Sequence, residues 1–234
     1  MPPPLAQPEP NPSPSSDGDT ALSSAVDAII TRFDAVNAVR DHAVGTGRQI
    51  VRCSANAVRA LHREDHDEAH ALLATAAELL AGVRASTAAF PTIASAGYVQ
   101  DAAKEYAEAA ITASLLQNRP IPGPAALTVD DAAWLNGLAE AGSELRRDVL
   151  DRLRADRPED AERLLAQMDA IYAVLVTVDF PDAITGGLRR TTDQFRAVLE
   201  RTRGDVTLSI RQQRLERALA RHEATMELGR SAER

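Results

Sequence analysis

Cysteine is almost absent from this chain, since Cys53 is the single one among 234 residues. One thiol cannot close an intrachain disulfide, and it has no second thiol with which to build a zinc site, so a disulfide scaffold and a zinc ribbon are excluded. A run of about 18 apolar residues, which a membrane-spanning helix needs, is also missing, and the N-terminus lacks the basic and then apolar pattern of a secretion signal. We therefore expect a cytoplasmic protein without a membrane partner.

Aromatic residues are scarce as well, at 3%, and the formal net charge is -8. This acidity argues against broad coating of nucleic acid or of an anionic membrane by the whole surface, but it leaves room for a concave basic pocket. Among the 26 lysines and arginines, all but Lys104 are arginine. Arginine suits bidentate contacts with phosphate or carboxylate, although genome composition explains such a bias equally well.

Proline is concentrated at one end, because seven of the 13 prolines fall between Pro2 and Pro14. This stretch holds almost nothing apolar and cannot bury enough surface to offset its ordering entropy. We therefore predict a disordered Pro-rich tail over residues 1–19, followed by one helical domain over residues 20–230.

Helical spacing of apolar residues fills the rest of the chain, and the remaining prolines divide it. No convincing alternating pattern indicates a strand. Thr128 and Asp131 stand at capping-box spacing, Pro158 suits a first helical turn, and Gly45 and Gly47 are the weakest point of the first helix. The pattern predicts an all-α, seven-helix antiparallel bundle. The expected helices cover approximately residues 20–63, 67–89, 94–118, 128–154, 158–179, 183–203 and 205–229.

Acidic residues lie on one side of two successive predicted helices. At about 100° per residue, Glu105 and Glu108 share a strip of the third helix that has apolar arcs on both sides, and Glu140 and Glu144 border the apolar face of the fourth. If these helices are neighbours, four carboxylates converge. Such an all-oxygen cluster suits Mg²⁺ or Mn²⁺, and a bound metal supports phosphodiester hydrolysis. The alternative is a pair of solvated acidic faces matched by arginines such as Arg147.

A second pattern, His66-Asp67-Glu68-Ala69-His70, comes near the zinc-protease motif. The residue after the first histidine is aspartate, which is too short for the usual base, and no third ligand is evident. We interpret this segment as a polar helix start. Ferritin-like di-iron chemistry is disfavoured too, because neither acid pair carries a histidine.

Several short strings, in order and in register over about residues 25–215, together resemble the translin and translin-associated factor X family, especially its prokaryotic single-gene members. The strings are Leu61-His62-Arg63, Lys104-Glu105-Tyr106-Ala107-Glu108-Ala109, Trp134-Leu135-Asn136-Gly137-Leu138, Ser143-Glu144-Leu145-Arg146-Arg147, Asp179-Phe180-Pro181-Asp182-Ala183-Ile184, Leu188-Arg189-Arg190 and Arg203-Gly204-Asp205.

The resemblance implies a translin-like seven-helix subunit that assembles into a hollow octamer with single-stranded nucleic acid inside. It also implies that the factor X branch carries a Mg²⁺-dependent ribonuclease site, made by Glu-Tyr-x-Glu on one helix and by an Asp followed four residues later by Glu on the next. The translin branch lacks these acids and only binds. Here Glu105, Glu108 and Glu144 match, while Glu140 occupies the Asp position, and its extra methylene moves the carboxylate by about 1.5 Å.

The first functional hypothesis is a Mg²⁺- or Mn²⁺-dependent endoribonuclease that acts on single-stranded or short structured RNA inside an octameric homo-oligomer. Glu105, Glu108 and Glu140 would hold the metal, and Glu144 would complete its shell or orient a water as general base. A second hypothesis is a non-catalytic protein that binds single-stranded RNA or DNA. A third sets the family aside and sees a helical scaffold for another protein.

Candidate phosphate contacts lie on the first helix and near the sixth. Their alternative role is to form ion pairs with the 34 acids of the chain. Few aromatics means little base stacking, so we expect weak sequence preference. Leucines spaced along the last predicted helix offer more apolar surface than one bundle covers, which favours oligomerisation. The candidate phosphate contacts are Arg52, Arg59, His62, Arg63, Arg189 and Arg190.

Overall fold

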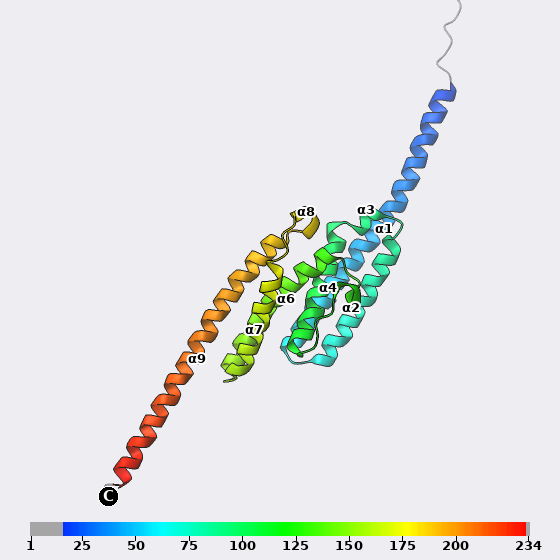
Figure 1. Ribbon diagram of the computed structural model, residues 1–234. Helices are drawn as coiled ribbons and strands as arrows, with labels where there is room; N and C mark the ends of the chain where they lie inside the picture. The colour runs from blue at the N-terminus through cyan, green and yellow to red at the C-terminus, as the bar shows by residue number, and fades with distance from the viewer. Residues whose placement is uncertain (1–15, 233–234) are drawn as a thin grey trace, which may run out of the picture.

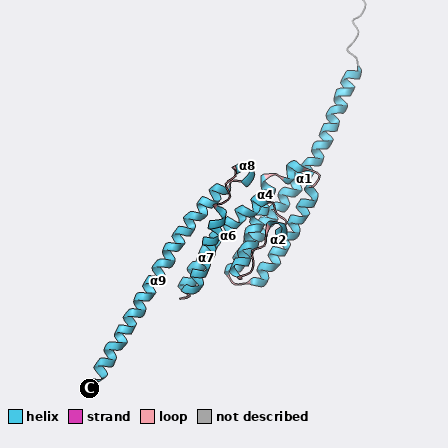
Figure 2. Cartoon of the chain, in the orientation of Figure 1, coloured by secondary structure: helices cyan, strands magenta, loops and turns pink. Residues whose placement is uncertain are grey.

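The computed structural model describes residues 16–232, and helices account for every regular element among them (Figures 1 and 2). This confirms the predicted all-α class. Residues 1–15, which hold most of the predicted Pro-rich tail, lie outside the described residues. The long helices are α1 (Ser16–His62), α2 (His66–Thr87), α4 (Gly97–Leu116), α6 (Asp131–Arg154), α7 (Pro158–Leu175) and α9 (Leu188–Ala232), and the short ones are α3 (Pro91–Ala94), α5 (Pro124–Leu127) and α8 (Asp182–Thr185).

Two groups of helices pack against each other. Helices α1, α2 and α4 form one group, helices α6, α7 and α9 form the other, and α4 packs against α6 where the groups meet (Figure 1). The buried core is continuous across this contact. Its largest fully buried side chains include Ile50, Ile111, Leu145, Leu164 and Phe195, which come from both groups. The α4–α6 contact is therefore the middle of the molecule.

The first and last helices extend beyond this body at opposite ends (Figure 1). Apolar side chains along both extensions are exposed: Leu22, Val26, Ile30 and Phe33 on α1, and Leu208, Leu215, Leu219 and Met226 on α9. None of the described helices is long and apolar enough to cross a membrane. The exposed apolar residues are interspersed with charged ones along both helices.

The last two predicted helices are in fact one, which corrects the expected break between Arg203 and Asp205. Helix α9 runs through Gly204 without interruption. A lone glycine costs only about 1 kcal/mol in a helix interior and, unlike proline, removes no hydrogen bond. Helix α1 passes through Gly45 and Gly47 in the same way.

The predicted capping box at Thr128 is also wrong. Thr128 adopts a left-handed conformation, with φ of 54°, and ends the short helix α5. Asp130 stands at the N-cap of α6, but its side chain makes no cap hydrogen bond. Instead it accepts hydrogen bonds from Arg84 and Gln100. Pro158 does lie in the first turn of α7, as predicted.

One glycine sets the spacing between α4 and α6. A Cβ added to Gly137 would lie 2.9 Å from the backbone nitrogen of Glu108 and 2.9 Å from the backbone oxygen of Lys104. Backbone atoms cannot yield as a flexible side chain does, so only glycine permits this approach. The close contact lies beside Glu105 and Glu108 on α4 and one turn before Glu140 on α6.

A buried amide fixes the same part of α6 to the last helices. Asn136 donates one hydrogen bond of 2.8 Å to the carbonyl of Thr185 on α8. Its side-chain oxygen accepts a 2.7 Å hydrogen bond from the Thr191 hydroxyl on α9. These bonds hold α6 against α8 and α9 on one side while Gly137 sits on α4 on the other.

Candidate metal centre

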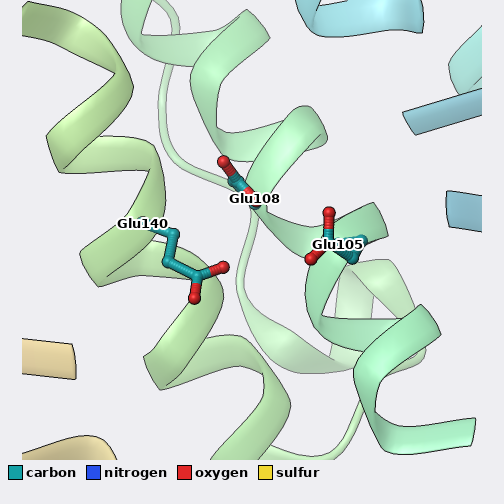
Figure 3. A group of neighbouring side chains, drawn as sticks. All are labelled: Glu105, Glu108 and Glu140. Carbon is teal, nitrogen blue, oxygen red and sulfur yellow. The ribbon is translucent and has the colours of Figure 1, made fainter. Parts of the chain in front are cut away.

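Helices α4 and α6 bring three of the predicted acids together. Glu105 and Glu108 lie one turn apart on α4, and Glu140 reaches toward them from α6 (Figure 3). One carboxylate oxygen of each lies within 4.8 Å of the others. We call these three residues the acid centre. Their oxygen atoms are close enough to share one small cation, and oxygen is the donor that Mg²⁺ and Mn²⁺ prefer.

Glu108 lies deepest in the acid centre. Burial, together with the negative charges of Glu140, Glu105 and Glu144, raises the pKa of the Glu108 carboxyl to about 8, and the charge of Lys104 acts against this rise. Without an added cation, the neutral acid is therefore favoured at neutral pH. The acid centre has more negative oxygens than the protein itself neutralises.

Lys104 is the one basic group among the described residues that bonds to the acid centre. Its ammonium lies 2.7 Å from a carboxylate oxygen of Glu140 and 3.2 Å from one of Glu105, so it bridges α6 and α4. Burial lowers the pKa of Lys104, but the two carboxylates outweigh that effect and raise it above its ordinary value. In the sequence, Lys104 stands out as the single lysine and begins one of the family-like strings, but neither feature predicts its bond to Glu140. Its position just before Glu105 and one turn before Glu108 was an available signal.

Glu144 stands beside the acid centre and has a different partner. Its carboxylate lies 3.1 Å from Nε2 of His62, and Asp148 lies 2.9 Å from Nδ1 of the same ring. The hydrogen bonds that the ring donates to Asp148 and Glu144 raise the pKa of His62 to about 9, against the effect of burial. His62 is therefore a cation at neutral pH, with an N–H donated to each acid. We call these three residues the histidine cluster.

The expectation that His62 contacts phosphate does not fit this geometry. Its side chain is only 3% exposed, and both ring nitrogens already face carboxylates. In the sequence, His62 falls among the arginines at the end of the first helix, and nothing there shows that it faces residues of α6. His62 instead ties the end of α1 to α6.

A pocket of about 300 Å³ lies between α1, α4 and α6. Glu105, Glu108 and Glu144 line it together with His62, and Arg59 and Arg147 bring positive charge to it. The hydroxyl of Ser54, on the α1 wall, is buried and has no hydrogen-bond partner among the described residues. This pocket, which we call the acid pocket, thus combines carboxylates, guanidinium groups and a hydroxyl without a hydrogen-bond partner among the described residues.

The other predicted phosphate contacts fall in two places. Arg52 is exposed on the same helix as Arg59, whereas Arg63 is exposed in the turn that follows α1 and pairs with Glu68 at 2.6 Å. Arg189 and Arg190 lie at the start of α9. Both line a pocket that contains no residue of the acid centre. Of the predicted phosphate-binding arginines, only Arg59 therefore lines the acid pocket, and Arg52 lies on the same helix.

The His66–His70 segment is the start of α2. Asp65 caps this helix by accepting a hydrogen bond from the backbone nitrogen of Glu68. His66 and His70 both lie within hydrogen-bond distance of Gln117, at the end of α4. This agrees with the interpretation of the segment as a polar helix start.

Comparisons with known proteins agree with this architecture. A structure of AfC3PO in complex with duplex RNA and a crystal structure of AfC3PO are each 30% identical to this chain, with a TM-score of 0.72, and cover 79% of this chain and 96% of their own. The crystal structure of apo-NeC3PO has the same TM-score and coverage at 17% identity, and therefore supports the fold alone. An uncharacterized protein of Methanocaldococcus jannaschii is 29% identical over 187 residues, which is 79% of this chain and 82% of that protein. No family model matches the chain.

The match to AfC3PO spans nearly the whole of that protein, in both sequence and structure. The resemblance inferred from the short strings is therefore confirmed, and the prokaryotic single-gene type is consistent with these relatives. This chain belongs to the translin/C3PO family.

Proposed function

We propose that this protein is a divalent-metal-dependent endoribonuclease that cleaves single-stranded or short structured RNA within a homo-oligomer. The observation that carries the proposal is the acid centre, in which three carboxylates from two helices approach within 4.8 Å. The family relationship supports a nucleic-acid-binding role, and the relative AfC3PO has been determined in complex with duplex RNA.

The donor set fits a hard cation. Three carboxylates converge, and the raised pKa of Glu108 reflects a local excess of negative charge that a cation would relieve. Mg²⁺ or Mn²⁺, when bound, supplies positive charge that stabilises a phosphate during hydrolysis. Glu105, Glu108 and Glu140 would hold it.

Glu144 is suited to a different task. Its carboxylate is oriented by the imidazolium of His62 and lines the same pocket as Glu105 and Glu108. A carboxylate that is fixed in this way can accept a proton from an attacking water. We therefore assign Glu144 as the general base and His62 as the residue that positions it.

The RNA backbone would lie along the basic side of α1. Arg59 and Arg147 reach the acid pocket, Arg52 is exposed on α1, and Arg63 is exposed just after the end of α1. Arginine binds phosphate through paired N–H groups. Arg189 and Arg190 on α9 would contact a more distant part of the strand.

A homo-oligomer, taken here as an octamer, accounts for the apolar extensions of α1 and α9. Residues such as Phe33 and Leu208 are each 68% exposed in the single subunit. Rows of exposed apolar side chains on long helices are typical of subunit contacts. An assembly of identical subunits would bury them and would enclose the bound RNA.

A second candidate function is RNA binding without cleavage. Lys104 favours it, because its ammonium already bonds two of the three acids. Glu140, one methylene longer than the aspartate expected from the family pattern, favours it as well. In this case the fold, the oligomer and the arginines would serve binding of RNA or single-stranded DNA alone.

One experiment tests both candidates. Labelled single-stranded RNA and a short RNA duplex are incubated with the protein in Mg²⁺, Mn²⁺ or EDTA. The same assay is run on Glu105→Gln/Glu108→Gln and on a matched control, Glu78→Gln/Glu162→Gln, which changes two exposed glutamates on α2 and α7.

We expect metal-dependent cleavage by the wild type and the control, and RNA binding without cleavage by the acid-centre variant. Binding without cleavage by the wild type in every metal would establish the second candidate. Absence of both binding and cleavage would contradict the two of them.

A further inference from the structure

Lys104 occupies an unusual place for the only lysine of the chain. Its ammonium lies 2.7 Å from Glu140 and 3.2 Å from Glu105, and its side chain is 23% exposed. An exposed lysine usually pairs with one acid at the surface and contributes little. Lys104 instead joins acids on two helices, at the point where Gly137 brings the helix backbones together.

The position of the ammonium matters because it coincides with the acid centre. Two of the three carboxylates that face one another already bond to it. A lysine ammonium is a compact point charge on a flexible stem, and it attracts carboxylate oxygens much as a small metal ion does. A second cation held by the same oxygens would be repelled at short range.

Removal of this charge would leave the acids without compensation. Lys104 is the one charge that opposes the three carboxylates acting on Glu108. The lysine therefore holds α4 and α6 together in the metal-free protein, where the carboxylates of Glu105 and Glu140 would otherwise repel each other.

We propose that Lys104 is an internal counter-ion that occupies the acid centre and must withdraw before a divalent cation binds there. This inference rests on the proposed function and concerns its regulation. The four-carbon stem allows the ammonium to move toward solvent without a backbone change. The lysine then sets the metal concentration at which the acid centre fills, and it keeps the empty centre stable.

The test is a measurement of Mn²⁺ binding by electron paramagnetic resonance and by calorimetry on the full-length protein. The variants are Lys104→Met, which removes the charge and keeps the stem, and Lys104→Arg, which keeps the charge. Arg152→Met is the matched control, since Arg152 is also 23% exposed and links α6 to the turn between α1 and α2, through a 3.0 Å contact with Glu64.

We expect Lys104→Met to bind Mn²⁺ with a Kd lower by about tenfold or more, because a repelling charge a few ångströms away is gone. Lys104→Arg and Arg152→Met should stay within about threefold of the wild type. In EDTA, Lys104→Met should melt at a lower temperature than the wild type, and Mn²⁺ should raise its Tm by more.

An unchanged or higher Kd in Lys104→Met would overturn the inference, because the lysine would then position the acids rather than compete with the metal. The proposed function would stand in that case. If neither protein binds Mn²⁺, the metal centre of the proposed function fails, and the inference fails with it. Should Lys104→Met not fold, Lys104→Gln gives the same comparison with a polar side chain.

Discussion

Helix α6 carries two carboxylate clusters about one turn apart, and they differ in how well their charge is balanced. In the histidine cluster, two acids meet one imidazolium whose side chain is 3% exposed, and each acid receives one N–H. In the acid centre, two of the three acids bond to one lysine, and the pKa of the third, Glu108, rises to about 8. In the histidine cluster, both acids are paired with a cation and the contacts join α1 to α6. In the acid centre, the positive charge present is too small to keep Glu108 ionised at neutral pH. A cluster left short of charge is where a cation is expected to act.

The sharpest way to separate the clusters is to change Glu108. Glu108→Gln should lower RNA cleavage by about hundredfold or more, since it removes a ligand, while the Tm in EDTA stays equal or rises because the buried acid is largely neutral already. Asp148→Asn is the counterpart in the histidine cluster and should lower the Tm. Cleavage assays and thermal melts on both variants check this. A large drop in Tm for Glu108→Gln would show that its carboxylate is part of the structural link.

Breaking the histidine cluster should lower stability, and it should also lower cleavage because His62 orients Glu144. His62→Gln leaves Asp148 buried and Glu144 half-buried without their cation, and we expect a loss of about 2–3 kcal/mol in the free energy of unfolding. Urea denaturation measures it. Mn²⁺ affinity should change little, since His62 touches none of the three residues of the acid centre. A variant as stable as the wild type would contradict the role of His62 as a tie between α1 and α6.

Gly137 controls one cluster only. Gly137→Ala places a Cβ 2.9 Å from two backbone atoms of α4, so the helices must separate, at a cost of about 1–3 kcal/mol. Glu140 then moves away from Glu105 and Glu108, while the link from His62 to α6 is spared. Mn²⁺ titration should show weaker binding. Gly82→Ala on α2, where an added Cβ meets no atom within 4 Å, is the control and should bind Mn²⁺ as the wild type does.

The two clusters should also titrate in different windows, and this is the smallest effect. The folded pKa of His62 is raised to about 9 from 6.5, so its contribution to stability is full below pH 6.5 and is lost as the pH rises through 9. The folded pKa of Glu108 is raised to about 8 from 4.5, so its ionisation lowers stability between those values. Unfolding measured from pH 5 to 10 in EDTA should lose the upper slope in His62→Gln and the lower slope in Glu108→Gln. Identical slopes in both variants would contradict these assignments.

Local periodicity was enough to predict that two of the three residues of the acid centre share a helix face. Glu105 and Glu108 share a face because residues three apart on a helix always do, and Glu140 with Glu144 follows the same rule. The sequence could not show that the two helices are neighbours, so their contact remained an assumption. It depends on Gly137, whose close approach to α4 is a tertiary contact that no spacing along the chain reveals.

The parts that sequence reasoning missed are contacts between distant residues. His62 and Asp148 are separated by 86 positions, so nothing local distinguishes His62 from the neighbouring arginines of α1. Lys104 is adjacent to Glu105 in sequence, but its bond to Glu140 depends on the packing of α6. Gly204 and Thr128 misled for the opposite reason: both carry local boundary signals that the tertiary fold overrides.

The position of His62 in the last turn of α1 has a mechanical consequence. Arg59 lies one turn earlier on the same helix and opens onto the acid pocket. An RNA strand bound to Arg59 would displace the helix that also carries the His62 ring. Through its contact with that ring, Glu144 would move as well. Binding of the substrate by Arg59 and orientation of Glu144 by His62 would then be coupled through the last turn of α1.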